Sequence, residues 1–243
     1  MLVSGSRLVL AAALAGSAVA PAAVVGVLEP TIAALERVVA DNPEDLRSCA
    51  EYRQRIIAAG DYDRSIKLLE RLAARPGSGP NVHVSLALAY VDKVPVVSPF
   101  RRIFLGRDAM REATLAIERE PSAVAYYMRG LVALYYPEAL FHKARGGIAD
   151  LEHALAIVLT QRPQPSDARV YMSLGDGYWK VHELSRAISI WTDGLNRFPT
   201  NADLRTRLAV KGVGLDRLIE RVLDPATRVD TSLQELFGST PAS

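Results

Sequence analysis

The alternation of apolar and polar positions is most regular over residues 168–201. Each half of this stretch repeats apolar side chains at the i, i+3, i+4, i+7 spacing, which predicts two successive amphipathic helices. Small residues stand within each half, Gly175 in the first and Ala187 and Gly194 in the second. Because these small side chains let two helices approach closely, residues 168–201 are expected to form a helical hairpin.

Weaker copies of the same unit lie upstream, over residues 52–76, 86–121 and 126–155. The first copy has Gly60 at its turn, but it carries Arg53 at the position of Gly175 and Ser65 at the position of Ala187. Residues 31–43 look like a second helix without its first. Since self-similarity at a period of roughly 20–50 residues is the signature of repeat architectures, the chain is predicted to be a solenoid.

The best copy closely resembles the tetratricopeptide repeat (TPR) pattern, without a gap, at Tyr171, Leu174-Gly175, Tyr178, Ala187, Trp191, Gly194 and Pro199. Gly194 stands where the family usually has alanine, a change that keeps the side chain small. The resemblance covers about residues 30–212 and is degenerate outside the best copy. It implies an all-α fold, a right-handed α-solenoid of TPR-like helix-turn-helix repeats with a helical C-terminal cap.

The two ends of the chain differ from this array. Residues 8–28 carry no charge and follow Arg7, so residues 1–28 are interpreted as a signal peptide or, if uncleaved, a membrane anchor. The array is assigned to residues 29–212 and capping helices to residues 213–237, with residues 238–243 as a flexible tail. Asp230 or Thr231 is expected to cap a short last helix that docks on the array through an apolar face.

Two copies are longer than the family spacing allows, near residues 91–105 and 135–145. Both inserts fall between the first and second helix of their repeat, so we expect them to emerge as loops on the same edge, side by side. They are rich in aromatic and basic residues, a composition typical of interaction surfaces. The insert-edge patch is therefore defined as Phe100, Arg101, Arg102, Phe104, Tyr136, Phe141 and Lys143. Its aromatic side chains could equally fold back as a small core, or form a homodimer interface.

The resemblance also implies a concave groove lined by the first helix of each repeat, where TPR domains bind extended peptides or helices. The positions of this chain that correspond to the groove include Gln54, Asp92, Tyr127, Met128, Tyr135, Asp176, Trp179 and Lys180. The set is apolar and aromatic in its middle and lacks the Lys/Asn/Arg cluster that clamps a terminal carboxylate in chaperone-binding TPR domains. A helix with apolar anchors is the partner that this composition favours.

Composition narrows the chemistry. The chain has 29 basic and 27 acidic residues, and a net charge of +2 does not suggest a nucleic-acid binder. The single cysteine, Cys49, excludes an intramolecular disulfide framework and a cysteine-based zinc finger. The histidines lack the i, i+4 spacing of a zinc helix, and no nucleophile elbow, phosphate loop or dinucleotide fingerprint occurs. No metal, cofactor or enzymatic activity is expected.

The resulting hypothesis is a non-catalytic scaffold or adaptor of the bacterial cell envelope, exported and either periplasmic or tethered to the inner membrane. Its partner would be another protein, held in the groove for assembly, transport or maturation. Contact with a membrane is expected only through an uncleaved N-terminal segment. The alternative is a periplasmic, TPR-like component that binds a small molecule beside a transporter, similar in architecture to the helical component of TRAP transporters.

Overall fold

The computed structural model describes residues 30–227 and 229–233, and this part of the chain is built of helices without a β-strand. Residues 1–28, interpreted above as a signal or anchor, lie outside it. The elements in chain order are α1 (Ile32–Asp41), α2 (Leu46–Ala59), α3 (Tyr62–Ala73), α4 (Pro80–Lys93), the 3-10 turn η1 (Val94–Val96), α5 (Pro99–Arg119), α6 (Ala123–Tyr135), α7 (Glu138–Phe141), α8 (Ala144–Leu159), the 3-10 turn η2 (Pro165–Asp167), α9 (Ala168–Lys180), α10 (Leu184–Arg197), α11 (Ala202–Ala209) and α12 (Val213–Val222).

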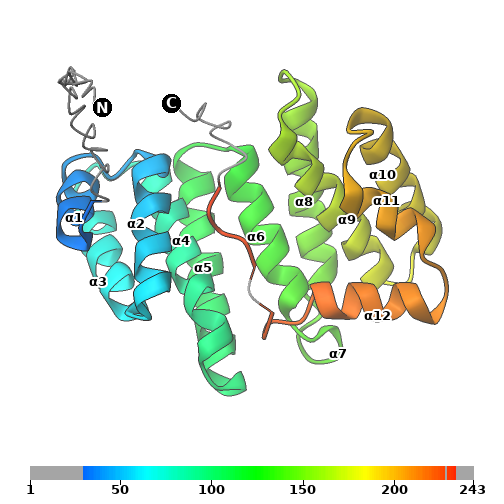
Figure 1. Ribbon diagram of the computed structural model, residues 1–243, viewed down its shortest axis with the longest axis horizontal. Coiled ribbons are helices and arrows are strands. Elements are labelled where there is room, and N and C mark those ends of the chain that lie inside the picture. The colour runs from blue at the N-terminus through cyan, green and yellow to red at the C-terminus, as the bar shows by residue number, and fades with distance from the viewer. Residues whose placement is uncertain (1–29, 228, 234–243) are drawn as a thin grey trace, which may run out of the picture. The chain divides into compact units, whose positions relative to one another are not determined.

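The helices of residues 31–222 pair as hairpins, α2 with α3, α4 with α5, α6 with α8 and α9 with α10. Each hairpin packs on the next through α3 and α4, α5 and α6, and α8 and α9, so the hairpins stack in sequence order (Figure 1). The first helices also meet one another directly, α2 with α4, α4 with α6 and α6 with α9. The first helices therefore share one face of the stack, which is where the groove was expected.

Close helix crossings explain the glycine positions of the repeat. A Cβ atom at Gly175 in α9 would lie 2.1 Å from the indole Nε1 of Trp191 in α10, and one at Gly194 would lie 2.7 Å from the Tyr171 Cβ. In the preceding hairpin, a Cβ at Gly130 would lie 2.8 Å from the carbonyl oxygen of Gly147. Because real Cβ atoms do not approach so closely, these crossings require residues without a side chain.

Turn chemistry ends the helices where the sequence predicts. Gly60 closes α2 in the left-handed conformation, with φ of 70°, which glycine adopts without steric cost. Thr31 and Asn201 cap the N-termini of α1 and α11 by accepting hydrogen bonds from the amides of Ala34 and Leu204. The predicted lone helix of residues 31–43 is thus present as α1.

The inserts fold differently from the expected loops. Residues 99–105 of the first insert extend α5 at its N-terminal end, because Pro99 supplies a favourable first helical residue and the chain continues helically through residues 100–105. Phe100 and Phe104 are therefore one helical turn apart on α5, with ring centroids 5.0 Å apart. The second insert forms the short helix α7, which ends at His142 in the left-handed conformation.

The C-terminal segment also departs from expectation. α12 forms as predicted and buries Leu215 and Ile219, with Gly212 at a φ of 54° before it. Residues 229–233, however, are extended rather than helical, so the expected cap of a last helix at Asp230 or Thr231 is wrong for the described residues. The side chain of Asp230 and the main chain of Thr231 instead bond to α9 and α2, far away in sequence. The predicted docking on the array therefore occurs through an extended segment.

Over residues 30–227 and 229–233, none of the helices combines the length and the apolar character needed to span a bilayer.

Candidate functional site

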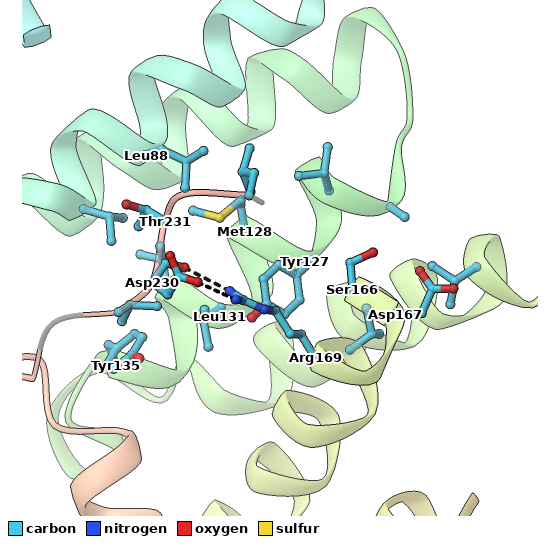
Figure 2. Close-up of a pocket in the computed structure, with 18 residues that line it drawn as sticks. Leu88, Tyr127, Met128, Leu131, Tyr135, Ser166, Asp167, Arg169, Asp230 and Thr231 are labelled. Atoms are coloured by element: carbon cyan, nitrogen blue, oxygen red, sulfur yellow. Dashed lines mark hydrogen bonds and ion pairs between the residues drawn. The ribbon is translucent and has the colours of Figure 1, made fainter. Parts of the chain in front are cut away.

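The face shared by the first helices carries an extended piece of the chain itself. Residues 229–233, called the resident segment here, run along α4 and α6 and reach α2 and α9 (Figure 1). Between the segment, α4, α6 and α9 remains a cavity of about 80 Å³, drawn in Figure 2. The groove of the first helices is thus a surface that already holds a peptide chain.

Several of the predicted groove residues meet at this place. Tyr127, Met128 and Tyr135 line the cavity from α6 (Figure 2). The side-chain amide of Gln54 in α2 lies 3.5 Å from the hydroxyl of Thr231. Burial raises the pKa of Tyr135 well above its usual range, so its hydroxyl is neutral at every physiological pH. This part of the groove therefore offers hydrogen-bonding groups along an apolar floor.

The other predicted groove residues are engaged within the array. Asp176 is 1% exposed and accepts two hydrogen bonds from Arg207 of α11, both at 2.7 Å. The Trp179 indole donates to Asp216 of α12, at 3.1 Å. In this conformation the prediction of a partner contact is wrong for Asp176, because its carboxylate is buried under α11.

Lys180 is committed elsewhere as well. Its ammonium group donates to the carbonyl oxygens of Leu134, at 2.5 Å, and Tyr136, at 2.9 Å, at the C-terminal end of α6. Burial lowers the pKa of Lys180, and Glu138 partly opposes that shift. A helix C-terminus presents carbonyl groups without intrahelical partners, so Lys180 acts as a cap rather than as a groove residue.

Arg53 is the largest omission from the predicted site. It replaces the glycine of the repeat, and its guanidinium is 1% exposed. Nη1 donates to Asp92 at 2.8 Å, and Nη2 donates to the main-chain carbonyl of Thr231 at 2.7 Å. The Thr231 hydroxyl bonds to the other oxygen of Asp92. Since a buried charge needs partners, this polar cluster depends on the resident segment to complete it. The sequence did contain a signal for this polar cluster, because Arg53 stands where the repeat pattern has glycine.

A second arginine holds the start of the resident segment. Arg169 of α9 donates to the carbonyl oxygen of Asp230 at 3.0 Å and to its carboxylate at 2.6 Å (Figure 2). Burial raises the pKa of Asp230, but hydrogen bonds from Ser232 and Arg169 outweigh it and hold the pKa below its usual range. Arg169 therefore binds the carboxylate of Asp230 in its charged form.

The end of the resident segment is apolar. Leu233 is buried among side chains of α4 and α6, including Val84, Leu88 and Met128. Burying a leucine side chain contributes about 2 kcal/mol, comparable with one or two charge-assisted hydrogen bonds. The resident segment is therefore held by an ion pair at one end, a buried polar cluster in the middle and an apolar anchor at the other end.

Both inserts line a second pocket, of about 430 Å³, so they lie side by side as their common place in the repeat predicts. Its wall is largely apolar and includes Phe100, Ile103, Tyr136 and Phe141, together with Val229, the first residue of the resident segment. Some residues of the insert-edge patch are buried in this region, and others are exposed to solvent. Tyr136 is buried and its hydroxyl donates to the carbonyl oxygen of Ile103 at 2.9 Å, whereas Phe100 is 69% exposed.

The basic residues of the insert-edge patch have different roles. Arg101 and Lys143 are exposed. Arg102 is partly buried and donates to the carbonyl oxygen of Val97 at 3.2 Å, which ties the start of α5 to the preceding turn. Phe104 is 41% exposed and stacks beneath the guanidinium of Arg107. Exposed aromatic and basic side chains thus alternate on the first turns of α5.

One group of side chains has the order of a catalytic triad. The His83 ring lies 2.8 Å from Glu112 through Nδ1 and 3.4 Å from the Ser78 hydroxyl through Nε2. The Ser78 hydroxyl, however, donates to the carbonyl oxygen of Ala73 at 2.8 Å. The amide of Gly79, next to Ser78, which would have to stabilise an oxyanion, already donates to Glu44, as do the amides of Asn81 and Val82. The geometry fits a stabilised start of α4 rather than a nucleophile.

Within residues 30–227 and 229–233, no three side chains among His, Cys, Asp and Glu come together as a metal site would require.

Comparisons with known proteins agree with the repeat pattern. No protein-family profile matches the sequence, and no curated protein matches it at a significant level. Among solved structures, it is similar to TTC0263, a thermophilic TPR protein of Thermus thermophilus, with a TM-score of 0.56 and 22% identity over 73% of this chain and 87% of that chain.

A further similarity is to a chain of the APC/C hetero-tetramer Cut9–Hcn1, with a TM-score of 0.52 and 16% identity. It covers 83% of this chain and 35% of the longer chain. At such identities the similarity concerns the fold. Together with the stacked hairpins and their glycine crossings, it confirms the fold that the sequence predicts, an all-α TPR-like solenoid.

Proposed function

We propose that this chain is a non-catalytic adaptor that holds a segment of another protein in the groove of its first helices. The observation that carries the proposal is the resident segment, because it occupies the groove through contacts that any extended chain of suitable sequence can make. The solenoid fold supports the same role, since the similar chain of the APC/C hetero-tetramer works within an assembly of proteins. The expected partner is thus an extended peptide rather than the helix favoured by composition.

Site-specific photo-crosslinking in intact cells tests this proposal. A photoreactive amino acid at Tyr127, in the groove, should crosslink a discrete partner protein. The matched control carries it at Lys67, an exposed position on α3. A partner captured at Tyr127 but not at Lys67 supports the adaptor. Identical proteins captured at both positions, or crosslinks at Tyr127 only within the chain itself, would contradict it.

The proposed place of action is the bacterial cell envelope, on the periplasmic side or tethered to the inner membrane. The uncharged run of residues 8–28 after Arg7 supports export. Fractionation of cells that express the chain with a C-terminal tag should place it outside the cytoplasm, and mass spectrometry of its N-terminus should separate a cleaved signal from a retained anchor. A tag found wholly in the cytosol would contradict export.

A small-molecule binder is the second candidate, and the pocket of about 430 Å³ at the insert edge favours it. Ligand pockets usually measure roughly 300–1,000 Å³ and are mainly apolar, as this one is. An apolar fluorescent dye such as N-phenyl-1-naphthylamine should bind to the wild type with a stoichiometry of one. Ile103→Trp, which would fill the pocket, should abolish binding, whereas Leu159→Trp, at an exposed site on α8, should not. Equal binding by both variants would refute a site in this pocket.

A further inference from the structure

We propose that the resident segment is a built-in copy of the ligand motif, so that the groove recognises an aspartate, a serine or threonine, a small residue and a leucine in succession. A partner must then displace the chain's own residues 230–233 in order to bind. This inference rests on the adaptor function proposed above and adds to it the sequence class of the partner and the competition that limits its access.

The aspartate position is read by Arg169. One guanidinium nitrogen donates to the Asp230 carbonyl at 3.0 Å and the other to its carboxylate at 2.6 Å, so main chain and side chain are held together (Figure 2). The amide of Ser232 donates to the same carboxylate at 2.9 Å and bends the segment there. A longer glutamate could not satisfy both arms of the fork at the same main-chain position, and a neutral residue would lose the charge-assisted bond.

The second position needs a hydroxyl group. Thr231 is 4% exposed, and its hydroxyl donates to Asp92 while the amide of Gln54 approaches the same oxygen. Asp92 is otherwise held by Arg53. Valine has nearly the shape of threonine, but it would leave a buried carboxylate oxygen of Asp92 without its donor. Serine or threonine is therefore required, and the charged pair of Arg53 and Asp92 acts as the reader.

The last two positions are set by burial. Ser232 is 8% exposed, which leaves room for a small side chain. Leu233 fills the apolar pocket between α4 and α6. It does so at a φ of 57°, a left-handed conformation that is unfavourable for leucine, so the resident segment binds with a strain that another ligand need not carry.

The groove also has binding capacity that the resident segment leaves unused. The cavity of about 80 Å³ beside it is lined by Ser166. The Ser166 hydroxyl is buried and lacks a hydrogen-bond partner among the described residues. A buried hydroxyl without a partner is costly, and a ligand with a polar group at this place would relieve that cost. A longer partner segment can thus contact more of the groove than residues 229–233 do.

Peptide binding to the full-length protein tests the motif. The probe is a fluorescein-labelled peptide of residues 226–236, and the released variant is the full chain with Asp230→Lys and Leu233→Ser. In the wild type the resident segment competes at an effective concentration of up to about millimolar. We therefore expect the released variant to bind the probe at least about tenfold more tightly than the wild type. Equal affinity for both proteins would overturn the competition.

Variants of the probe test the reading of each position. Replacing its threonine with valine should weaken binding about tenfold or more, whereas replacing it with serine should change affinity little. Arg169→Glu, in a released variant that carries Asp230→Ser in place of Asp230→Lys so that its own segment cannot pair with the new glutamate, should abolish binding of the probe and restore binding of a probe with lysine in place of aspartate. Circular dichroism checks that Arg169→Glu is folded, and its spectrum should match that of the wild type. A probe insensitive to these changes would refute the motif.

The two proposals fail in different ways. If the released variant ignores the probe while Tyr127 still crosslinks a partner, the motif is wrong and the adaptor function stands. If the probe binds as expected but no partner is crosslinked even in the released variant, the groove serves only to fasten the chain's own end, and the adaptor function falls together with the inference.

Discussion

Each end of the groove contains a buried carboxylate, Asp176 at one end and Asp92 at the other, and the two differ in which part of the chain supplies their hydrogen-bond donors. Asp176 in α9 is closed off by Arg207 through two hydrogen bonds of 2.7 Å, both partners belonging to packed helices. Asp92 in α4 takes one bond of 2.8 Å from Arg53 and a second from Thr231, which belongs to the extended resident segment. The same fold thus produces a completed ion pair at one end and a cluster that a peptide completes at the other.

This difference separates structural from binding roles within one solenoid. Around α9, the cap helices α11 and α12 bury Leu204, Leu215 and Ile219 in the core and cover the groove with regular structure. Around α4 and α6, the covering element has no hydrogen-bonded secondary structure, and side chains of the array hold it by its main-chain carbonyls as well as by its side chains. A surface covered by packed helices is part of the core, whereas one covered by a short extended segment can exchange its occupant.

Breaking the completed ion pair is expected to have the largest effect. Arg207→Met leaves Asp176 buried without its partner, which should cost about 3–5 kcal/mol of the free energy of unfolding. Chemical denaturation measures it. Arg145→Met, which breaks the exposed pair with Glu183, is the control and should change stability little. If the two variants lost equal stability, the ion pair of Asp176 and Arg207 would not be structural.

Glycine crossings provide the next test, because they hold the repeat together independently of the groove. Gly175→Ala forces a Cβ against the ring of Trp191 and should destabilise the fold by about 1–3 kcal/mol or more. At Gly146 an added Cβ meets open space, so Gly146→Ala should be neutral or stabilise the helix by about 0.5–1 kcal/mol. Thermal unfolding of both variants compares them. A stable Gly175→Ala would mean that α9 and α10 are not so closely packed.

Loosening the resident segment should affect only one end of the groove. Thr231→Ala with Leu233→Ser removes the hydroxyl and the apolar anchor, and amides of α4 and α6 should lose about 1–2 kcal/mol of protection from hydrogen exchange. Amides of α10 should keep theirs, because α10 lies in the C-terminal core. Equal deprotection of α10 would show that the segment stabilises the whole solenoid.

The smallest expected effect is the pH dependence of segment docking. The pKa of Asp230 is lowered in the docked state, so its contribution is fully present above the ordinary aspartate pKa of about 3.9 and is lost as the pH falls through the docked value. Because Asp230 is largely exposed, the change should remain below about 1 kcal/mol. Hydrogen exchange of α4 between pH 6 and 3 measures it, and Asp230→Asn should abolish the dependence. A change of the opposite sign would exclude the contact with Arg169 in solution.

The helices and turns could be predicted from the sequence because the residues that determine them are close together along the chain. The i, i+3, i+4 pattern with Gly175 and Trp191 predicted a hairpin that the structure contains, and the extra residues of two repeats predicted which edge they occupy. Pattern alone did not reveal that residues 99–105 continue a helix, because aromatic and basic residues occur in loops and helices alike. The sequence pattern also predicted a short last helix capped by Asp230 or Thr231, whereas residues 229–233 are extended.

For the groove, the sequence predicted the positions of the residues but not their interactions. Its positions followed from the repeat register, and Tyr127, Met128 and Tyr135 line a cavity as the register implies. The repeat register did not reveal which polar groove positions are available to a partner. Asp176 and Lys180 form hydrogen bonds with residues that are far from them in the sequence.

The sequence by itself determined the class of fold, because repeats contact only their neighbours and carry their packing rules within each unit. The tertiary structure alone decided what occupies the groove. Thr231 meets Arg53 and Asp92 only when the chain beyond α12 returns across α4. Thr231 is 178 positions from Arg53 and 139 positions from Asp92 in the sequence. No local pattern encodes such a meeting, because its stability comes from groups that become neighbours only after the solenoid has formed.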